Sequence, residues 1–346
     1  MNSMKSVKEI YDFFLQATNS DKHQASLLDL LGTLPEFNQM SDNGISTMNM
    51  SLGKEYLTIC DEMCKDFLLL KVKDASVIQI DAEYIAVPSV NSDNPQDFMH
   101  TIEYGMYDFK YRGFTHVHKC FSNSVSPIVG KNRHTGNEDI GTCYYIGRNM
   151  FVTAAHCVKG LEYFNILLPD DTSLELTEVW FAKDENLDDF DLAIILCKNV
   201  PQYIKAFELS NANVLDKIMI MGYPPIPGLN PVLISETASV GSYVEGRQKA
   251  SIGQVVAETG SYMSKLDFFI ITARVKGGNS GSPVINREGY VIGTVFQIPF
   301  DSQKGADEGR YDILGYGICL PSKYIESIIK DHESHKLFLE SGSYKE

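Results

Sequence analysis

Residues 277–284 read Gly-Gly-Asn-Ser-Gly-Ser-Pro-Val, a serine between glycines with apolar runs before and after it. Such a stretch brings the Ser280 hydroxyl to the tip of a tight turn and leaves the backbone N–H groups around it free. N–H groups of this kind can stabilise a negatively charged oxygen during a reaction. The same residues are also ordinary turn formers, so the interpretation depends on two stretches farther upstream.

The first of these stretches holds a histidine. Residues 153–157 read Thr-Ala-Ala-His-Cys and follow the apolar, strand-like run from Met150 to Thr153. A serine hydroxyl is a poor nucleophile at neutral pH and needs a base such as imidazole to take its proton. His156 is the one histidine flanked by small residues directly after an apolar strand, which makes it the candidate base. The alternative is a buried, structural histidine.

The second stretch begins with an aspartate. Asp191 precedes the apolar run Leu-Ala-Ile-Ile-Leu, and a carboxylate in that place is costly to bury unless it is paired. An imidazole that acts as a base needs such a carboxylate to fix its tautomer and stabilise its charged form. A solvated aspartate at a strand edge is the alternative. Asp188 and Asp189 are nearby candidates, but they lie in a polar segment.

Together, and in this order, the three stretches resemble the trypsin/chymotrypsin-fold serine proteases. Thr-Ala-Ala-His-Cys is similar to the histidine box of that family, Asp-Leu-Ala-Ile to its aspartate strand and Gly-Asn-Ser-Gly to its serine turn. The asparagine-containing turn resembles that of bacterial HtrA/Deg-type proteases and glutamyl endopeptidases. The resemblance covers about residues 120–330, and we expect no PDZ domain after residue 330.

The resemblance implies a mainly β fold with two six-stranded antiparallel β-barrels. It also implies that Ser280 is the nucleophile, that His156 is the general base and then acid, and that Asp191 is the orienting carboxylate. The backbone N–H groups of Gly278 and Ser280 would form the oxyanion hole. Glycine suits position 278 because a Cβ could obstruct a peptide that turns its N–H inward.

The sequence departs from trypsin itself at several positions. Asn279 stands where trypsin has an aspartate that receives a freshly cut N-terminus, and an amide cannot form that ion pair. Residues 127–130, Pro-Ile-Val-Gly, superficially resemble the trypsin activation site but lie too close to Gly141. We therefore expect them to form a first barrel strand. Cys143 and Cys157 resemble the trypsin disulfide near the histidine, but Cys143 is displaced, so we expect two free thiols.

The substrate pocket is less clear from the sequence. The resemblance points to Arg274, Val275, Thr294 and Phe296 as residues that would line it. Arg274 argues against a preference for basic side chains. It could favour an acidic side chain or be structural, and an apolar pocket is a further alternative.

The rest of the chain is consistent with this organisation. Short strand-like runs alternate with turns after about residue 118, which is typical of an antiparallel barrel or sandwich. We predict three parts: an α+β accessory domain at 1–117, helical and then strand-rich, a protease domain at 118–330 and a polar tail at 331–346. The aromatic stretch from Tyr104 to Val117 is expected to form one or two strands.

Composition excludes several classes of partner. The formal net charge is −15, which disfavours nucleic acid, and no run of about 18 apolar residues predicts a transmembrane helix. The N-terminus carries no secretory signal pattern, and the odd number of scattered cysteines suits a reducing compartment. We expect a cytoplasmic protein without metal or cofactor, although non-classical export as an effector is an alternative.

The prediction is thus a serine endopeptidase that forms an acyl-enzyme and is regulated through residues 1–117. Its partners would be protein or peptide substrates and a regulatory protein. The alternative is a latent or inactive protease-fold binding module that acts through a partner.

Overall fold

The computed structural model describes residues 4–40, 46–76, 80–88, 95–136, 138–170, 172, 174–181, 190–224, 248–260, 266–297, 316–330 and 336–345. The chain divides into two compact units, Met1–Gly113 and Phe114–Glu346. Each unit has its own hydrophobic core, and the two are described separately below.

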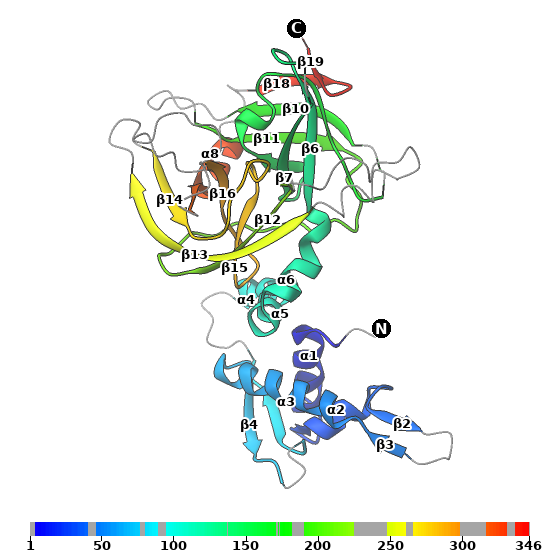
Figure 1. The fold of residues 1–346 in the computed structure, drawn as a ribbon. Coiled ribbons are helices and arrows are strands. Elements are labelled where there is room, and N and C mark those ends of the chain that lie inside the picture. The colour runs from blue at the N-terminus through cyan, green and yellow to red at the C-terminus, as the bar shows by residue number, and fades with distance from the viewer. Residues whose placement is uncertain are drawn as a thin grey trace. The chain divides into compact units, whose positions relative to one another are not determined.

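The first unit combines helices with a small antiparallel sheet of order β1-β5-β4 (Figure 1). A two-stranded hairpin, β2-β3, accompanies that sheet. Helices α1 and α3 pack against the sheet strands β5 and β4, respectively. The elements are α1 (Val7–Thr18), β1 (Ala25–Ser26), α2 (Leu27–Gly32), β2 (Asn38–Met40), β3 (Ser46–Met48), α3 (Met50–Lys65), β4 (Leu69–Lys73), β5 (Glu83–Ala86), α4 (Pro95–Tyr104) and α5 (Met106–Arg112).

Helix α1 illustrates how local sequence and packing agree in this unit. Ser6 and Glu9 form a capping box at its first turn, which satisfies backbone N–H groups that the helix leaves unpaired. The carboxylate of Asp108, on α5, accepts a further bond from the Val7 N–H at 3.1 Å. The apolar face of the helix, including Ile10 and Phe14, is buried in the core.

The aromatic stretch from Tyr104 to Val117, predicted as strands, is helical instead. Helices α4 and α5 are followed by α6 (Phe114–Phe121), and Gly105 and Gly113, with φ of 94° and 71°, separate the three. Aromatic residues favour strands on average, but Tyr107 and Tyr111 are four residues apart and their rings contact each other along one helix face. Packing of that face outweighed the strand propensity of the residues.

The second unit consists of two closed β-barrels and short helices. Its elements before the barrels are α6 and the 3₁₀ turn η1 (Ser122–Ser124). The first barrel contains β6 (Val125–Asn132), β7 (Glu138–Tyr145), β8 (Met150–Thr153), β9 (Leu161–Ile166), β10 (Glu175–Phe181), β11 (Ala193–Lys198), β18 (Lys336–Glu340) and β19 (Ser343–Tyr344). The second barrel contains β12 (Lys217–Gly222), β13 (Lys249–Gly260), β14 (Asp267–Ile271), β15 (Pro283–Asn286), β16 (Val291–Gln297) and β17 (Gly317–Pro321), and it is followed by helix α8 (Lys323–Lys330).

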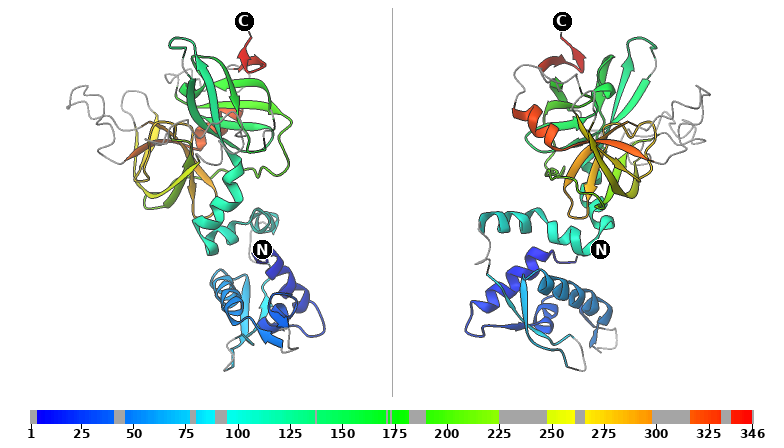
Figure 2. Two further views of the ribbon diagram at one scale, coloured as in Figure 1. Left: turned by 45° about the vertical axis from the view of Figure 1, so that its right-hand side comes forward. Right: turned by 90° about the vertical axis from the view of Figure 1, so that its left-hand side faces the viewer.

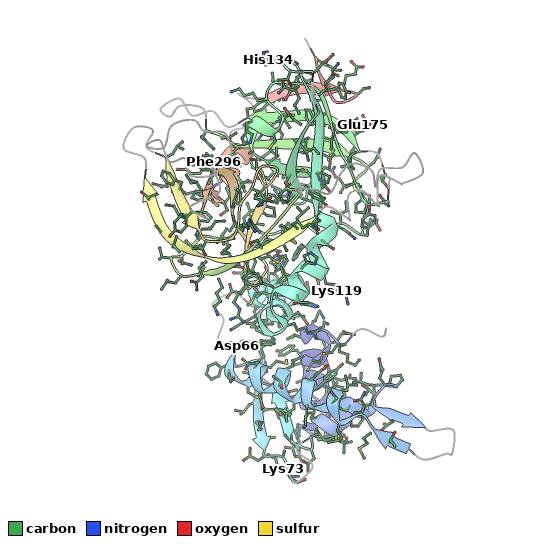
Figure 3. The ribbon with its side chains drawn as sticks, in the orientation of Figure 1. Asp66, Lys73, Lys119, His134, Glu175 and Phe296 are labelled. Carbon is green, nitrogen blue, oxygen red and sulfur yellow. The ribbon has the colours of Figure 1, made fainter. Side chains whose placement is uncertain are left out.

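The mainly β, two-barrel architecture is confirmed, with one correction to the first barrel. The second barrel has six strands as predicted, but the first closes with eight because the segment predicted as a polar tail forms β18 and β19. Ser341 and Gly342, with φ of 50° and 77°, form the two-residue turn of this hairpin. Leu339 is buried in the barrel core and Tyr344 packs against that core, so two apolar side chains anchor the hairpin. Figure 3 marks His134 at the end of the barrel where this hairpin lies, and the neighbouring Arg133 stacks over the Tyr344 ring.

The two barrels lie side by side in both views of Figure 2. Polar contacts cross the seam between them: the hydroxyl groups of Tyr144 and Thr294 hydrogen-bond at 2.7 Å. Residues 127–130 lie within β6, so the expectation that they form a barrel strand is confirmed. The predicted site residues come from the strand ends and turns that face this seam.

Candidate active site

His156 and Asp191 are brought together by strand register within the first barrel. Strand β8 pairs with β11 in antiparallel fashion, and Ala193 lies opposite Thr153. Residues just after Thr153 therefore lie beside residues just before Ala193. His156 follows β8 on the 3₁₀ turn η2 (Ala155–Cys157), and Asp191 stands two positions before β11. The small, buried Ala154 and Ala155 allow the turn to pack closely behind the imidazole ring.

Both oxygens of the Asp191 carboxylate contact His156. Oδ2 lies 2.5 Å from the ring Nδ1, and Oδ1 accepts the His156 backbone N–H at 2.8 Å. A carboxylate is an acceptor only, so Nδ1 carries the hydrogen of this bond and Nε2 is left as the acceptor nitrogen. The imidazole is half exposed at 50%, and the aspartate less so at 29%. The ring is thus oriented on one side and open on the other.

The pKa of His156 is affected by opposing influences. Burial lowers the pKa of the imidazole, whereas the hydrogen bond to Asp191 and the contact with Cys157 raise it, and the net result is a raised pKa. The carboxylate therefore stabilises the protonated ring, which is the form that a base reaches after it has taken a proton.

Ser280 follows a well-defined turn in the second barrel. The Asn279 N–H donates to the Lys276 carbonyl at 3.0 Å, which closes a four-residue turn. Gly278, in the third position, has φ of 86°, the value that a type II turn requires there. Type I and type II turns differ by a flip of their central peptide, here the one between Gly277 and Gly278. The turn type therefore fixes the direction in which the Gly278 N–H points.

The N–H groups of Gly278 and Ser280 donate no hydrogen bond within the described residues. Their neighbours are engaged instead: the Asn279 N–H bonds to Lys276, and the Gly281 N–H bonds to the Val295 carbonyl at 2.7 Å. Gly281 has φ of 84°, and a Cβ on it would lie 2.0 Å from the Thr142 carbonyl oxygen. Only glycine allows the serine turn to approach the first barrel this closely.

Two contacts bring the serine turn to the histidine. The Cys157 thiol, next to His156, lies 3.4 Å from the Ser280 carbonyl oxygen, and the Thr142 N–H donates to the same oxygen at 2.9 Å. Within the described residues, the Ser280 hydroxyl makes no hydrogen bond to His156. Such bonds are often long without substrate and shorten in the reactive complex. The contacts of Cys157 and Thr142 with the Ser280 carbonyl oxygen therefore place the serine turn beside the turn that carries His156.

Residues 141–293 match a family model described as "Trypsin-like peptidase domain". The match includes His156, Asp191 and Ser280, and it confirms the resemblance that the sequence motifs carried. Residues 141–293 are therefore similar to a trypsin-like peptidase domain.

Sequence relatives of the peptidase domain include proteins described as "Serine protease HtrA-like" from two strains of Staphylococcus epidermidis. Each is 24% identical over 225 residues, which cover 64% of this chain. The match spans 35% of the length of these curated relatives.

Solved structures similar to this chain include the Rv3671c protease from M. tuberculosis in its active form. It has a TM-score of 0.47 and 19% identity, covering 66% of this chain and 88% of that one. The HtrA-type protease AlgW with tripeptide has a TM-score of 0.46 and 17% identity, covering 63% of this chain and 62% of that one.

The four residues predicted to line the substrate pocket have different environments. Val275 is packed in the core of the second barrel, and Thr294 is fully buried with its hydroxyl bonded to Tyr144. Arg274 is exposed, and its backbone N–H donates to Ser251 Oγ at 2.9 Å. Phe296, labelled in Figure 3, is partly buried against the core of the first barrel. Arg274 and Phe296 keep side-chain surface that a substrate could reach, whereas Val275 and Thr294 are enclosed.

Sequence reasoning did not single out Thr142, which bonds to the serine turn through its hydroxyl and its backbone N–H. A polar residue inside an otherwise buried strand was the available signal, because such a group needs a hydrogen-bond partner. Asp188 and Asp189, the alternatives to Asp191, lie outside the described residues. All seven cysteines are free thiols, as expected for Cys143 and Cys157.

No cluster of His, Cys, Asp and Glu that could hold a metal ion occurs in the described parts of the chain. The helices of those parts also include none that is long and apolar enough to cross a membrane.

Proposed function

We propose that the protein is a serine endopeptidase whose catalytic triad is Ser280, His156 and Asp191. The observation that carries this proposal is an imidazole oriented by Asp191 that lies beside a serine turn. The Gly278 and Ser280 N–H groups of that turn donate no hydrogen bond among the described residues. Each part supplies what a serine hydroxyl lacks as a nucleophile at neutral pH.

The chemistry then follows from the positions of the groups. Ser280 Oγ attacks the carbonyl carbon of a peptide bond while its proton moves to His156 Nε2. The resulting oxyanion accepts hydrogen bonds from the Gly278 and Ser280 N–H groups. When the C–N bond breaks, Nε2 returns the proton to the leaving amine and an acyl-enzyme remains. Water, deprotonated by the same nitrogen, releases the acid and restores the serine.

Asp191 acts through the imidazole. Its hydrogen bond to Nδ1 keeps the tautomer in which Nε2 can accept a proton, and its charge stabilises the imidazolium that forms. The raised pKa of His156 agrees with this role.

The first unit is proposed to be an accessory domain that regulates the peptidase or recognises its partners. This proposal is supported by the structural independence of the first unit, which has its own hydrophobic core and its own helix caps. Protein or peptide substrates are the proposed partners of the peptidase domain. The seven free thiols support a reducing, cytoplasmic compartment.

Labelling with a fluorophosphonate probe tests the proposal. Wild type should be labelled covalently and should cleave members of a peptide library, whereas Ser280→Ala should lose both properties, with activity reduced on the order of 10⁶-fold. Ser282→Ala is the matched control, because Ser282 is two residues away in the same turn region and its buried hydroxyl has no hydrogen-bond partner among the residues that the structure describes.

The alternative function, a latent or inactive binding module, predicts a different result. Equal labelling of wild type and Ser280→Ala would contradict the triad. A correctly folded wild type that is neither labelled nor active alone, but becomes so with a partner, would identify a latent enzyme.

A further inference from the structure

The peptide between Gly278 and Asn279 lies between the two peptides that present N–H groups to the proposed oxyanion. Its own N–H end is fixed, because Asn279 donates to the Lys276 carbonyl within the type II turn. If this peptide rotated, the N–H groups of Gly278 and Ser280 on either side would change direction. Its carbonyl end therefore matters for the geometry of the whole turn.

That carbonyl is held by a side chain of the other barrel. Thr142, on β7 of the first barrel, donates its hydroxyl hydrogen to the Gly278 carbonyl oxygen at 2.7 Å. The same hydroxyl accepts the Tyr223 N–H, just after β12 of the second barrel, at 3.1 Å. Because a carbonyl oxygen can only accept, the hydroxyl hydrogen is the one that forms the bond to Gly278, while a lone pair of the same hydroxyl accepts the Tyr223 N–H.

The hydroxyl contact can be separated from the other contacts of Thr142. The Thr142 backbone N–H donates to the Ser280 carbonyl at 2.9 Å, and its carbonyl accepts the Thr153 hydroxyl at 2.7 Å. Both are main-chain contacts that a change of side chain leaves in place. Thr142 is fully buried, so water does not replace a lost hydroxyl.

We propose that Thr142 is a positioning residue for the oxyanion hole. Its hydroxyl fixes the Gly278–Asn279 peptide, so that the flanking N–H groups of Gly278 and Ser280 are aligned before substrate binds. This inference rests on the proposed function of the site. It assigns part of the active-site geometry to a side chain that contacts neither substrate nor the triad side chains.

A variant series tests the inference. Thr142→Val keeps the shape and the main-chain contacts but removes the hydroxyl, and Thr142→Ser keeps the hydroxyl. We expect kcat of Thr142→Val to fall roughly 10- to 100-fold with KM changed less than about twofold, because the lost alignment affects mainly the transition state. Affinity for a peptide boronate, which mimics that state, should fall by a similar factor. Thr142→Ser should stay within about threefold of wild type.

The control removes the same chemical group elsewhere. The Thr177 hydroxyl donates to the Leu196 carbonyl at 3.3 Å between β10 and β11, so Thr177→Val should leave kcat and boronate affinity unchanged. Hydrogen exchange provides a readout that needs no turnover. The Asn279 amide, protected by its bond to Lys276, should exchange faster in Thr142→Val than in wild type.

The outcomes separate this inference from the proposed function. An active wild type with an equally active Thr142→Val variant would overturn the role of Thr142 and leave the peptidase assignment intact. A wild type that is neither active nor labelled, alone or with a partner, would contradict the peptidase assignment, and the exchange experiment would then decide on Thr142. Unchanged exchange at Asn279 would overturn the inference in either case.

Discussion

His156 and Asp191 lie at the ends of two paired strands of one barrel. Ser280, in contrast, lies in a turn whose carbonyl groups accept hydrogen bonds from the neighbouring barrel. The first arrangement needs only the register of β8 and β11. The second needs Thr142 of the first barrel to meet the carbonyl groups of Gly278 and Ser280. One half of the site is built by local strand pairing and the other by contacts across the seam.

The difference suggests that the two halves fail in different ways. A change in the histidine–aspartate half should alter proton transfer and its pH dependence. A change in the serine turn should alter the stabilisation of the oxyanion and leave the pH dependence in place. The predictions below test this division, from the largest expected effect to the smallest.

Among the three variants and profiles that compare the two halves, the largest effect is expected for Asp191→Asn. An amide can donate to Nδ1 and so favour the tautomer in which Nε2 carries the hydrogen, which removes the base from the serine. We expect kcat to fall on the order of 10⁴-fold with little change in fold, measured by steady-state kinetics and circular dichroism. Asp267→Asn, in an exposed ion pair with Lys323 of the second barrel, is the control and should retain activity. A loss below tenfold for Asp191→Asn would refute its orienting role.

Gly278→Ala should have a smaller but still large effect. Alanine is strained at a φ of 86°, so the turn should relax by a flip that takes the N–H away from the substrate. We expect kcat to fall roughly 10²- to 10³-fold, as for the loss of one oxyanion-hole donor. Gly277→Ala is a matched control, because its φ is not positive and a Cβ there would meet nothing within 4 Å. Equal losses for both variants would refute the argument from Gly278.

The pH profile should give the smallest and most selective effect. Activity needs a neutral His156, and the pKa of this imidazole is raised, so the acid limb of kcat/KM should lie above the ordinary histidine value of about 6.5. When the residual activity of Asp191→Asn is measured, its acid limb should lie at lower pH than that of wild type. Burial still lowers the pKa of His156 in this variant, and the carboxylate no longer raises it. In Gly278→Ala the limb should stay in place. If the acid limb moved equally in both variants, the claim that only the histidine–aspartate half sets the pH dependence would be wrong.

Much of this site could be predicted from the sequence because its chemistry is concentrated in short segments. The histidine, aspartate and serine stretches each carry their flanking small or apolar residues within a few positions. The two barrels were expected from the resemblance to the protease family, and the strand at residues 127–130 from their short distance to Gly141. Alternation of short apolar runs and turns reflects local strand formation.

The errors have a common origin in packing. The stretch from Tyr104 to Val117 has strand-forming residues but is helical, since its aromatic rings pack along helix faces. The segment predicted as a polar tail contributes two strands to the first barrel, anchored by the buried Leu339. Neither outcome depends on the residues of the segment alone, because each requires a surface elsewhere in its unit.

The sequence by itself determined which side chains could take part in the chemistry, through the residue types and neighbours of His156, Asp191 and Ser280. Only the tertiary structure decided how the serine turn, with the N–H groups of Gly278 and Ser280, is held in place. Thr142 and Gly278 are 136 residues apart, and their hydrogen bond exists because two barrels pack against each other. A periodicity or motif reports the immediate neighbours of a residue along the chain. A hydrogen bond across a seam depends on the packing of both barrels, so no local pattern identifies its partner.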